Sequence, residues 1–462
     1  MQADRKKDTA FIGHPVGLGW LSASEFWERF AYYGVQPIIG LYLTHYLFQP
    51  EHMNRVWGFS AFRGFVELFY GRGSLPQLAI AIAGLYAALV YVTPLLGGLL
   101  ADRLIGRTPT VVIGAILMAA GQFMFASDVT LVPAFLCLLL GVGCFKGNIA
   151  SQVGDLYGHD DPRRADGFQI YFLGIQLAAI ATPLVCGTIA QKIDWHLGFV
   201  AAGIGMLIGL TIYLAGRKTF PPEPVRKTAG EPEYPPLTAK DWRVVAMLVV
   251  LLPVLALSLV SNQEIFGAYP LWAEKNYQLV FFGQTMPVSW MTSLDAFISA
   301  ILMAGIIIFW RWWATRWREP TEMTKIVIGT AISACAPLVL AAASAIAAST
   351  GKPVSIVWAF AFHIVNDLGF ANVLPFGLAL YSRAAPKGLG GIMIAVYYLH
   401  LAIGTALVGK LGTYLYSMPG TTFWAMHAAI MGVGLVLLIA ARFAFGKTLA
   451  PSYAEPKEEA AA

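Results

Sequence analysis

The chain has 462 residues, of which 57% are hydrophobic and only 12% are charged, with a net charge of +5. Soluble domains carry about 25% charged residues, and a single soluble core stops growing at about 250–300 residues. This composition excludes a disordered chain, a nucleic-acid-binding module and a cytosolic enzyme as leading interpretations. It is typical of a protein whose solvent is mostly lipid, and the 13 tryptophans suit aromatic belts at the membrane interfaces.

Twelve mostly apolar runs follow one another along the chain, and a helix crosses a bilayer with about 20 such residues. They cover residues 17–47, 76–101, 108–126, 130–150, 167–190, 196–216, 242–270, 287–310, 325–347, 354–381, 389–413 and 421–445. The sequence therefore predicts an all-α membrane protein with twelve transmembrane helices.

A polar, proline-rich segment at 217–241 divides the runs six and six. We therefore expect an N-terminal six-helix bundle at 17–216, a linker at 217–241 and a C-terminal six-helix bundle at 242–445. Short terminal segments, 1–16 and 446–462, complete the predicted organisation.

Most of the 31 lysines and arginines fall in segments on the same side as the N-terminus. Since cytoplasmic loops carry an excess of these residues, both termini are predicted to be cytoplasmic, in the inner cell membrane. Residues 1–15 are polar and lack the short apolar core of a cleaved signal peptide, so the first run is expected to be retained as a helix.

The four cysteines lie in or beside apolar runs, so neither a disulfide framework nor a metal site is expected. The sequence contains neither HExxH nor GxSxG, which argues against a membrane enzyme. No cofactor and no nucleic-acid partner are expected, and the chain is expected to act as a monomer.

Ionisable residues inside predicted spans are costly and usually face a bundle interior or a pathway. In the first run, Glu25, Glu28 and Arg29 share one face of a helix, and Lys146 lies in the fourth run. One interpretation is an exchangeable network, because protonation of an acid would free its basic partner. The other is a static polar seam between helices.

The second half carries its own ionisable residues at membrane depth. Glu264, Asp295 and Asp367 lie in the seventh, eighth and tenth runs. His363 and His400 are open to two interpretations, a satisfied buried histidine or a proton relay.

Residues 25–34 read EFWERFAYYG, and this segment resembles the first-helix motif of the proton-coupled oligopeptide transporter family, POT or PTR, of the major facilitator superfamily. Residues 98–107 resemble the superfamily's loop motif between helices 2 and 3, and residues 145–148 resemble the family's helix 4 motif. Further similar segments lie at 166–183, 287–294 and 375–387. The resemblance spans most of residues 13–445.

The resemblance implies a major facilitator fold and uptake of small peptides by alternating access, driven by inward proton flow. It implies proton-coupling roles for Glu25, Glu28, Arg29, Lys146 and Glu264, and gating roles for Asp102 and Arg103. The implied substrate-binding residues are Tyr32, Tyr33, Gln36, Tyr91, Asn148, Gln176, Trp290, Asp295, Asp367 and Phe370. The expected partners are protons, a peptide or peptide-like solute, and the lipid bilayer.

Several positions depart from the family pattern. They are Gln36 in place of an arginine, Gln176 in place of an asparagine, Asp295 in place of an asparagine, and Phe370 in place of a glutamate. Because glutamine does not recover the bidentate geometry of arginine, simple dipeptides are expected to bind poorly. The preferred solute would be bulkier or modified, with an amine facing Asp295 or Asp367.

Two alternatives stay open. In the first, the chain is an ordinary peptide symporter whose unusual acids only balance Lys146. In the second, it is a proton-coupled transporter of a non-peptide metabolite or drug, and possible export is part of that alternative because the superfamily loop motif does not fix direction. The first-helix motif favours uptake.

Overall fold

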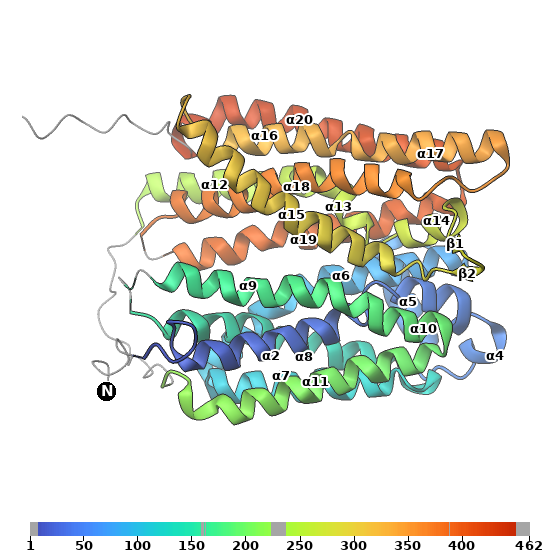
Figure 1. Ribbon diagram of the computed structural model, residues 1–462, viewed down its shortest axis with the longest axis horizontal. Helices are drawn as coiled ribbons and strands as arrows, with labels where there is room; N and C mark the ends of the chain where they lie inside the picture. The colour runs from blue at the N-terminus through green and yellow to red at the C-terminus, as the bar shows by residue number, and fades with distance from the viewer. Residues whose placement is uncertain (1–7, 159–160, 162, 223–236, 388, 450–462) are drawn as a thin grey trace, which may run out of the picture.

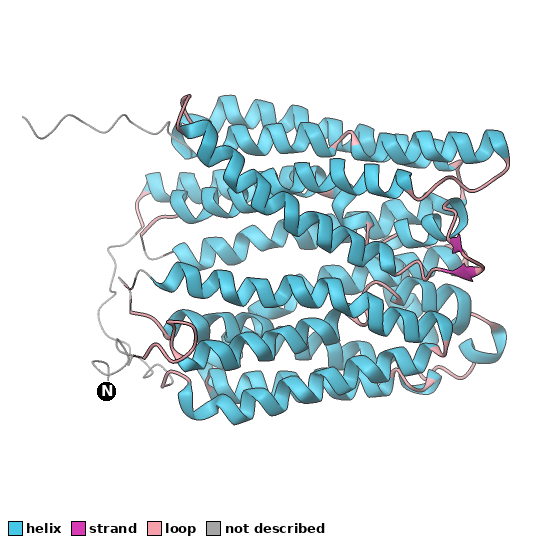
Figure 2. Ribbon diagram, in the orientation of Figure 1, coloured by secondary structure: helices cyan, strands magenta, loops and turns pink. Residues whose placement is uncertain are grey.

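The computed structural model describes residues 8–158, 161, 163–222, 237–387 and 389–449. Long helices run side by side along the long axis of the molecule (Figures 1 and 2). The predicted linker, 217–241, and the predicted terminal segments, 1–16 and 446–462, lie partly outside the described residues. Both ends of the described chain lie at one end of the molecule, and we call the opposite end the distal end.

The first half of the chain forms one group of packed helices, in the lower part of Figure 1. They are α2 (Val16–Tyr33), α3 (Ile39–Tyr42), α4 (Pro50–Met53), α5 (Phe59–Tyr70), α6 (Leu75–Leu100), α7 (Arg107–Met124), α8 (Leu131–Asp155), α9 (Arg163–Thr182), α10 (Thr188–Lys192) and α11 (Trp195–Gly216). Single turns of π-helix extend this set at Leu43–Leu47, Ala101–Ile105 and Pro183–Gly187, and 3₁₀ turns lie at Asp128–Thr130 and Arg217–Thr219.

The second half forms the other group. Its helices are α12 (Ala239–Ser258), α13 (Val260–Glu264), α14 (Tyr269–Asn276), α15 (Trp290–Ala314), α16 (Glu322–Ser333), α17 (Ala336–Thr350), α18 (Val357–Ala384), α19 (Gly390–Gly412) and α20 (Gly420–Leu449), with a 3₁₀ turn at Thr413–Tyr416. A small antiparallel hairpin of β1 (Val280–Phe281) and β2 (Gln284–Thr285) lies at the distal end and pairs Val280 with Thr285.

Two of the predicted continuous runs are broken in the structure. The run at 17–47 stops being α-helical at Tyr33 and resumes at Ile39. Pro37 lies in this gap, where it has no N–H to donate and disfavours helix at the residue before it. The run at 242–270 divides into α12, α13 and the start of α14, with a break at Leu259. These breaks place polar residues at the ends of short helices in the middle of the molecule.

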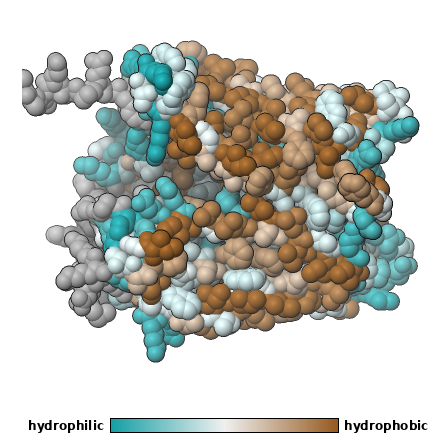
Figure 3. Space-filling model, in the orientation of Figure 1, coloured by the Kyte–Doolittle hydropathy of each residue, from teal (hydrophilic) through white to brown (hydrophobic). Residues whose placement is uncertain are grey.

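Ten helical segments of the described chain are long and apolar enough to cross a membrane. The other two predicted spans correspond to α2, which carries three charged residues, and α7, whose first turn is polar. Apolar residues cover most of the face seen in Figure 3, between two more polar ends. Exposed side chains such as Ile308 and Val436, each about two-thirds exposed, would contact lipid. The structure therefore confirms the all-α membrane class.

The two halves meet tightly at the distal end. The hydrogen bonds that join described residues of different halves all lie there. They link His45 with Glu274 (2.6 Å), Gln77 with the Thr413 carbonyl (3.0 Å), Lys410 with the Tyr70 carbonyl (2.5 Å), Gln191 with the Val288 amide (3.0 Å), Ser289 with the Pro183 carbonyl (3.4 Å) and Trp290 with Thr188 (2.8 Å). The halves are therefore closed against each other at this end.

Backbone contact between α6 and α19 reinforces this closure. A Cβ atom built on Gly84 would lie only 2.3 Å from the Cα atom of Gly409, so no side chain larger than hydrogen fits there without movement. The same helices meet again where a Cβ atom on Gly412 would lie 2.5 Å from the Ile80 side chain. Small residues let two membrane helices approach closely.

Candidate functional site

The ionisable residues of α2 form one buried cluster. Arg29 Nε lies 3.1 Å from Glu25 Oε1 and 2.5 Å from Glu28 Oε2, and Arg29 Nη2 donates to Glu28 Oε1 at 2.9 Å. All three side chains are at least 96% buried. The spacing of these residues along one helix face brings them together, as expected. Arg29 is thus held between two acids in an environment where buried charges need partners.

Lys146 extends this cluster from α8. Its charge acts on the carboxylates of both Glu25 and Glu28, although among the described residues it makes no direct ion pair. Lys146 Nζ instead lies 4.6 Å from the ring centroid of Tyr91 on α6, and the lysine is only half-buried. One oxygen of Glu25, Oε2, is buried and has no hydrogen-bond partner. In the described part of the chain, the cluster therefore contains a carboxylate oxygen without a hydrogen-bond partner and a lysine outside any ion pair.

An aromatic stripe continues from Arg29 toward the second half. The guanidinium carbon of Arg29 lies 5.2 Å from the Tyr32 ring centroid, and Tyr32 packs edge-on against Tyr33 at 5.2 Å. Tyr33 stacks on Phe266, which lies between α13 and α14 of the other half, with 6.5 Å between ring centroids. Gln36, one turn further, is buried. This face of α2 therefore lies at the junction of the two halves.

The other predicted substrate-binding residues differ in burial and in their hydrogen-bond partners. Gln176 and Phe370 are half-buried. Asn148 Nδ2 donates to the carbonyls of Cys144 (2.8 Å) and Gly97 (3.3 Å), which ties α8 to α6. Trp290 Nε1 donates to Thr188 at the distal contact. Asn148 and Trp290 are therefore hydrogen-bonded to neighbouring helices in this state, and among the described residues neither has a hydrogen bond with Tyr32 or Lys146.

Glu264 has a partner that the sequence reasoning missed. Glu264 Oε1 lies 2.7 Å from His427 Nε2 on α20, and the Ala268 amide donates to Glu264 Oε2 at 2.7 Å. Both side chains are fully buried. A histidine at mid-depth in the apolar run 421–445 was the available signal for this pair.

Asp295 and Asp367 are brought together by His363. His363 Nδ1 lies 3.0 Å from Asp295 Oδ1, and one ligand-type atom from each of Asp295, His363 and Asp367 lies within 4.8 Å of the others. Tyr269 on α14, which the sequence reasoning missed, contacts His363 Nε2 through its hydroxyl at 3.0 Å. The predicted substrate acids therefore belong to a hydrogen-bonded cluster in the second half.

The predicted gating residues lie at the end opposite the distal contact. Asp102 and Arg103 form part of the π-turn that follows α6, and the Asp102 side chain is 66% exposed. Arg107 Nε lies 3.9 Å from Asp102 Oδ1, and Arg107 also pairs with Asp155 at the end of α8. These contacts connect the ends of α6, α7 and α8 within the first half. The sequence did not predict that Asp155 would take part in these contacts.

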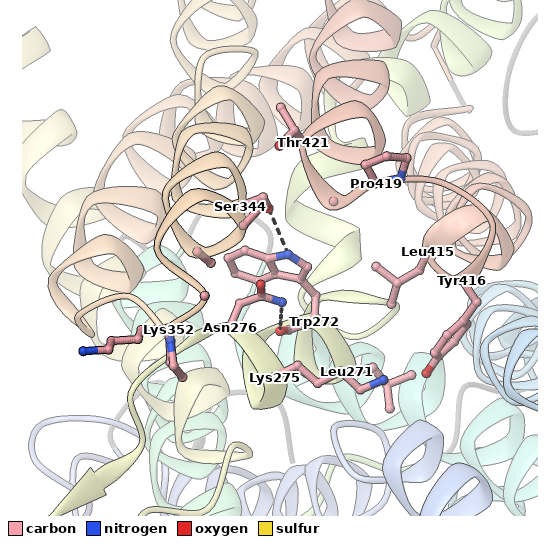
Figure 4. Close-up of a pocket in the computed structure, with 15 residues that line it drawn as sticks. Leu271, Trp272, Lys275, Asn276, Ser344, Lys352, Leu415, Tyr416, Pro419 and Thr421 are labelled. Atoms are coloured by element: carbon pink, nitrogen blue, oxygen red, sulfur yellow. Dashed lines mark hydrogen bonds between the residues drawn. The ribbon is translucent and has the colours of Figure 1, made fainter.

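A surface pocket of about 520 Å³ lies at the distal end, between α14, α17 and residues 415–421 (Figure 4). Trp272 Nε1 donates to Ser344 Oγ at 3.0 Å on its wall, and Lys275 and Lys352 lie at its rim. It contains none of the predicted coupling or substrate residues. We therefore do not assign the transported solute to this pocket.

A family model, curated relatives and solved structures all indicate similarity to the same family. A sequence model described as the POT family matches residues 108–235. The di-/tripeptide transporter of Lactococcus lactis subsp. cremoris is 28% identical over 95% of this chain and 97% of its own length. An uncharacterized transporter of Bacillus subtilis is also 28% identical, over 93% of this chain and 94% of its own length. The crystal structure of the peptide transporter POT in complex with alafosfalin superposes with a TM-score of 0.78 at 26% identity, covering 96% of this chain and 99% of that one.

The chain is similar to POT family transporters along nearly its whole length. The predicted resemblance and the predicted major facilitator fold are both confirmed. The proteins that it resembles are transporters, and ten helical segments of its described residues are long and apolar enough to cross a membrane.

Proposed function

We propose that this chain is a POT-type transporter that takes up a peptide or peptide-like solute by proton symport, through alternating access of one site between its two halves. The Lactococcus relative is named a di-/tripeptide transporter, which supports this solute class. The observation that carries the proposal is the placement of Arg29 between two fully buried acids, with Lys146 nearby. Such an arrangement has two acids that can exchange a proton without leaving Arg29 unpaired.

The chemistry follows from charge balance. When Glu25 or Glu28 takes a proton, the cluster gains one positive charge, while the other acid still pairs with Arg29. The attraction that holds Lys146 toward the two acids then weakens, because only one carboxylate remains. Lys146 becomes available to a carboxylate on the solute. Proton binding therefore favours solute binding, and loss of the proton favours release.

Glu264 is proposed as a second coupling residue, acting through His427. A protonated Glu264 would keep one acceptor oxygen but lose the charge that faces His427 at 2.7 Å. The pair lies where the seventh predicted span is broken into α13 and α14, so its rearrangement would act on a helix break. Short helices with free ends are common next to transporter binding sites.

The solute would lie between the aromatic stripe and the second half. Tyr32, Tyr33 and Tyr91 offer apolar and hydroxyl surface, and Lys146 offers the cation. An amine of the solute would approach Asp295, which is the least buried member of its cluster at 8% exposed. Gln36 and Phe370 replace the charged groups that the family pattern implies. The substrate is therefore proposed to be bulkier or more modified than dialanine.

Orientation follows from the distribution of lysine and arginine. Both termini are proposed to face the cytoplasm, so the closed distal end faces outward and the described state is inward-facing. The Asp102–Arg107–Asp155 contacts then lie on the cytoplasmic side, where they would brace the first half during opening and closing. The protein is proposed to act as a monomer in the inner cell membrane.

Uptake into proteoliposomes under an imposed inward proton gradient tests this proposal. The vesicles are screened with labelled di- and tripeptides, modified peptides and amine metabolites, with the gradient present and then collapsed by an ionophore. We expect concentrative uptake of at least one peptide-like solute only with the gradient. Transport confined to non-peptide solutes would overturn the proposal in favour of a metabolite transporter. Solute movement only in the direction opposite to the proton gradient would overturn it in favour of an exporter.

A further inference from the structure

A second titratable cluster lies in the other half of the protein, away from α2. Asp295 is on α15, and His363 and Asp367 are one helical turn apart on α18. His363 and Asp367 are fully buried, and Asp295 is 8% exposed. One ligand-type atom from each residue lies within 4.8 Å of the others. Three ionisable groups therefore share one enclosed site.

Hydrogen bonds fix the orientation of the imidazole. His363 Nδ1 lies 3.0 Å from Asp295 Oδ1, and His363 Nε2 lies 3.0 Å from the Tyr269 hydroxyl. A neutral imidazole satisfies both contacts when Nδ1 donates to Asp295 and Nε2 accepts from Tyr269. A doubly protonated ring also satisfies both, because the tyrosine oxygen can accept. His363 is thus held where it can gain or lose a proton without moving.

Among the residues that the structure describes, no lysine or arginine pairs with the acids of this cluster. In the described part of the chain, His363 is the only charged-type partner of Asp295, and Asp367 Oδ1 accepts from Asn366 Nδ2 at 3.1 Å. Asp367 Oδ2 and Asn366 Oδ1 are both buried without a hydrogen-bond donor. Two neighbouring carboxylates in an enclosed site cannot both remain charged unless a proton or a cation joins them. Within the described residues, these unpartnered oxygens are therefore acceptors that a proton or a cation can join.

The surrounding groups do not supply that charge. The hydroxyl of Tyr269 faces the cluster from α14, with Tyr277 behind it at 6.3 Å between ring centroids. Tyr33 approaches Asp295 from α2 of the other half. On α13 and α20, Glu264 and His427 already pair with each other. Each neighbour is neutral or already paired.

We propose that Asp295, His363 and Asp367 form a second proton-binding site, in which the two carboxyl groups share one proton and His363 is the next acceptor. The proton bonds to a carboxylate oxygen as O–H and is donated in a hydrogen bond to the facing carboxylate. No other bond forms or breaks. A proton is favoured over a metal ion because both nitrogens of His363 already have hydrogen-bond partners.

The site would link the solute amine to proton binding. Because Asp295 is the member that reaches the interface, an arriving ammonium group would pair with its carboxylate and leave the proton on Asp367. The solute and the proton could then be carried together in the second half, while Glu25 and Glu28 bind a proton in the first. This coupling role rests on the proposed function, whereas proton binding by the cluster does not.

Infrared spectroscopy of the reconstituted protein, without any solute, tests the site directly. A protonated carboxyl group gives a C=O stretch that is separate from carboxylate bands and shifts on deuteration. We expect such a band in the parent protein at neutral pH, and its loss or marked decrease in Asp367→Asn and in Asp295→Asn. Glu51→Gln, which changes an exposed carboxylate on α4, is the matched control and should leave the band unchanged.

His363→Gln is the companion variant, because glutamine keeps hydrogen bonding at this position. It should keep the carboxyl band but move the pH at which the band disappears. An unchanged band in both aspartate variants would overturn the proposal, whatever the transport assay gives. A stoichiometric metal ion in the purified parent protein, absent from Asp367→Asn, would replace it with a metal site. If Asp367→Asn fails to fold, Asp295→Asn and the parent band decide the question.

Proton counting then tests the coupling role separately. In proteoliposomes, the solute gradient that balances a fixed proton gradient gives the number of protons moved per solute. We expect Asp367→Asn to lower this number by one relative to the parent. An unchanged number with a lost infrared band would leave a proton site that is not coupled to transport, and would overturn only the coupling role.

Discussion

Glu264 on α13 and His427 on α20 face each other at 2.7 Å, and neither side chain has any exposed surface. The pair connects a five-residue helix to the last long helix of the second half. Removing one partner from a buried pair leaves the other uncompensated, which costs about 3–5 kcal/mol. The contact is therefore expected to stabilise the second half.

A double-mutant cycle on this pair is the first prediction. Glu264→Ala and His427→Ala should each lower the free energy of unfolding by about 3–5 kcal/mol, read as reduced thermal stability in detergent. The double variant should lose clearly less than the two single losses together, because neither partner is then left alone. Glu51→Ala serves as the exposed control. Additive losses would mean that the two residues do not interact.

The second prediction concerns Lys146. Lys146→Ala should abolish gradient-driven uptake, a loss of at least tenfold, because the cluster then has no cation that proton binding can release. The variant should still fold, since Lys146 makes no ion pair among the described residues. Lys192→Ala, an exposed lysine at the distal end, is the control. Parent-like proton-driven uptake by Lys146→Ala would remove Lys146 from the mechanism.

Local spacing explains what the sequence could predict. Glu25, Glu28 and Arg29 meet because residues three and four apart share a helix face, and this holds wherever the helix lies. The pairs Asp295–His363 and Glu264–His427 are separated by 68 and 163 residues. Their contact depends on how α15, α18, α13 and α20 pack, and no local pattern encodes that packing.

The same distinction applies to the fold. Apolar runs of sufficient length predicted the long helices, because a membrane imposes its thickness on them. The break after Tyr33 could have been placed at Pro37, yet Pro94, Pro253 and Pro375 all lie inside continuous helices. Neighbouring helices and local adjustments tolerate proline in a membrane span. A proline alone therefore does not locate a helix end in this protein.

The third prediction concerns the distal closure. Gly84→Ala places a methyl group 2.3 Å from the Gly409 Cα position, so α6 and α19 must separate. The population should move toward a state open at the distal end, with at least a severalfold rise in labelling of cysteines introduced along that interface. Gly305→Ala is the control, because a Cβ atom there meets nothing within 4 Å. Equal labelling of both variants would show that this contact does not hold the end closed.

The fourth prediction concerns Asp102. Its carboxylate lies 3.9 Å from Arg107 Nε, and Arg107 also pairs with Asp155. Asp102→Asn removes one of these contacts from the described state, which is closed at the distal end, and should shift the population away from that state. The shift cannot exceed the stability that the contact supplied, and an exposed ion pair supplies about 0.2–1 kcal/mol. Labelling from the two membrane faces should therefore change severalfold at most. Labelling identical to that of the parent would remove Asp102 from the gate.

The last prediction concerns the solute. Gln36 and Phe370 stand where the family pattern has an arginine and a glutamate, and Asp295 stands where it has an asparagine. A site with unpaired polar groups rejects the wrong ligand strongly, so dialanine should compete poorly with a bulkier solute that carries an amine.

Restoring the family residues should reverse this preference. Gln36→Arg combined with Phe370→Glu should strengthen dialanine binding by at least tenfold, because the peptide carboxylate regains a bidentate partner and its amine regains an acid. Asp295→Asn alone should weaken binding of the amine-bearing solute without improving dialanine. Competition binding measures both effects. If the parent binds unmodified dipeptides in the micromolar range and Asp295→Asn changes nothing, the altered residues leave selectivity untouched, and the protein is a peptide symporter of ordinary preference.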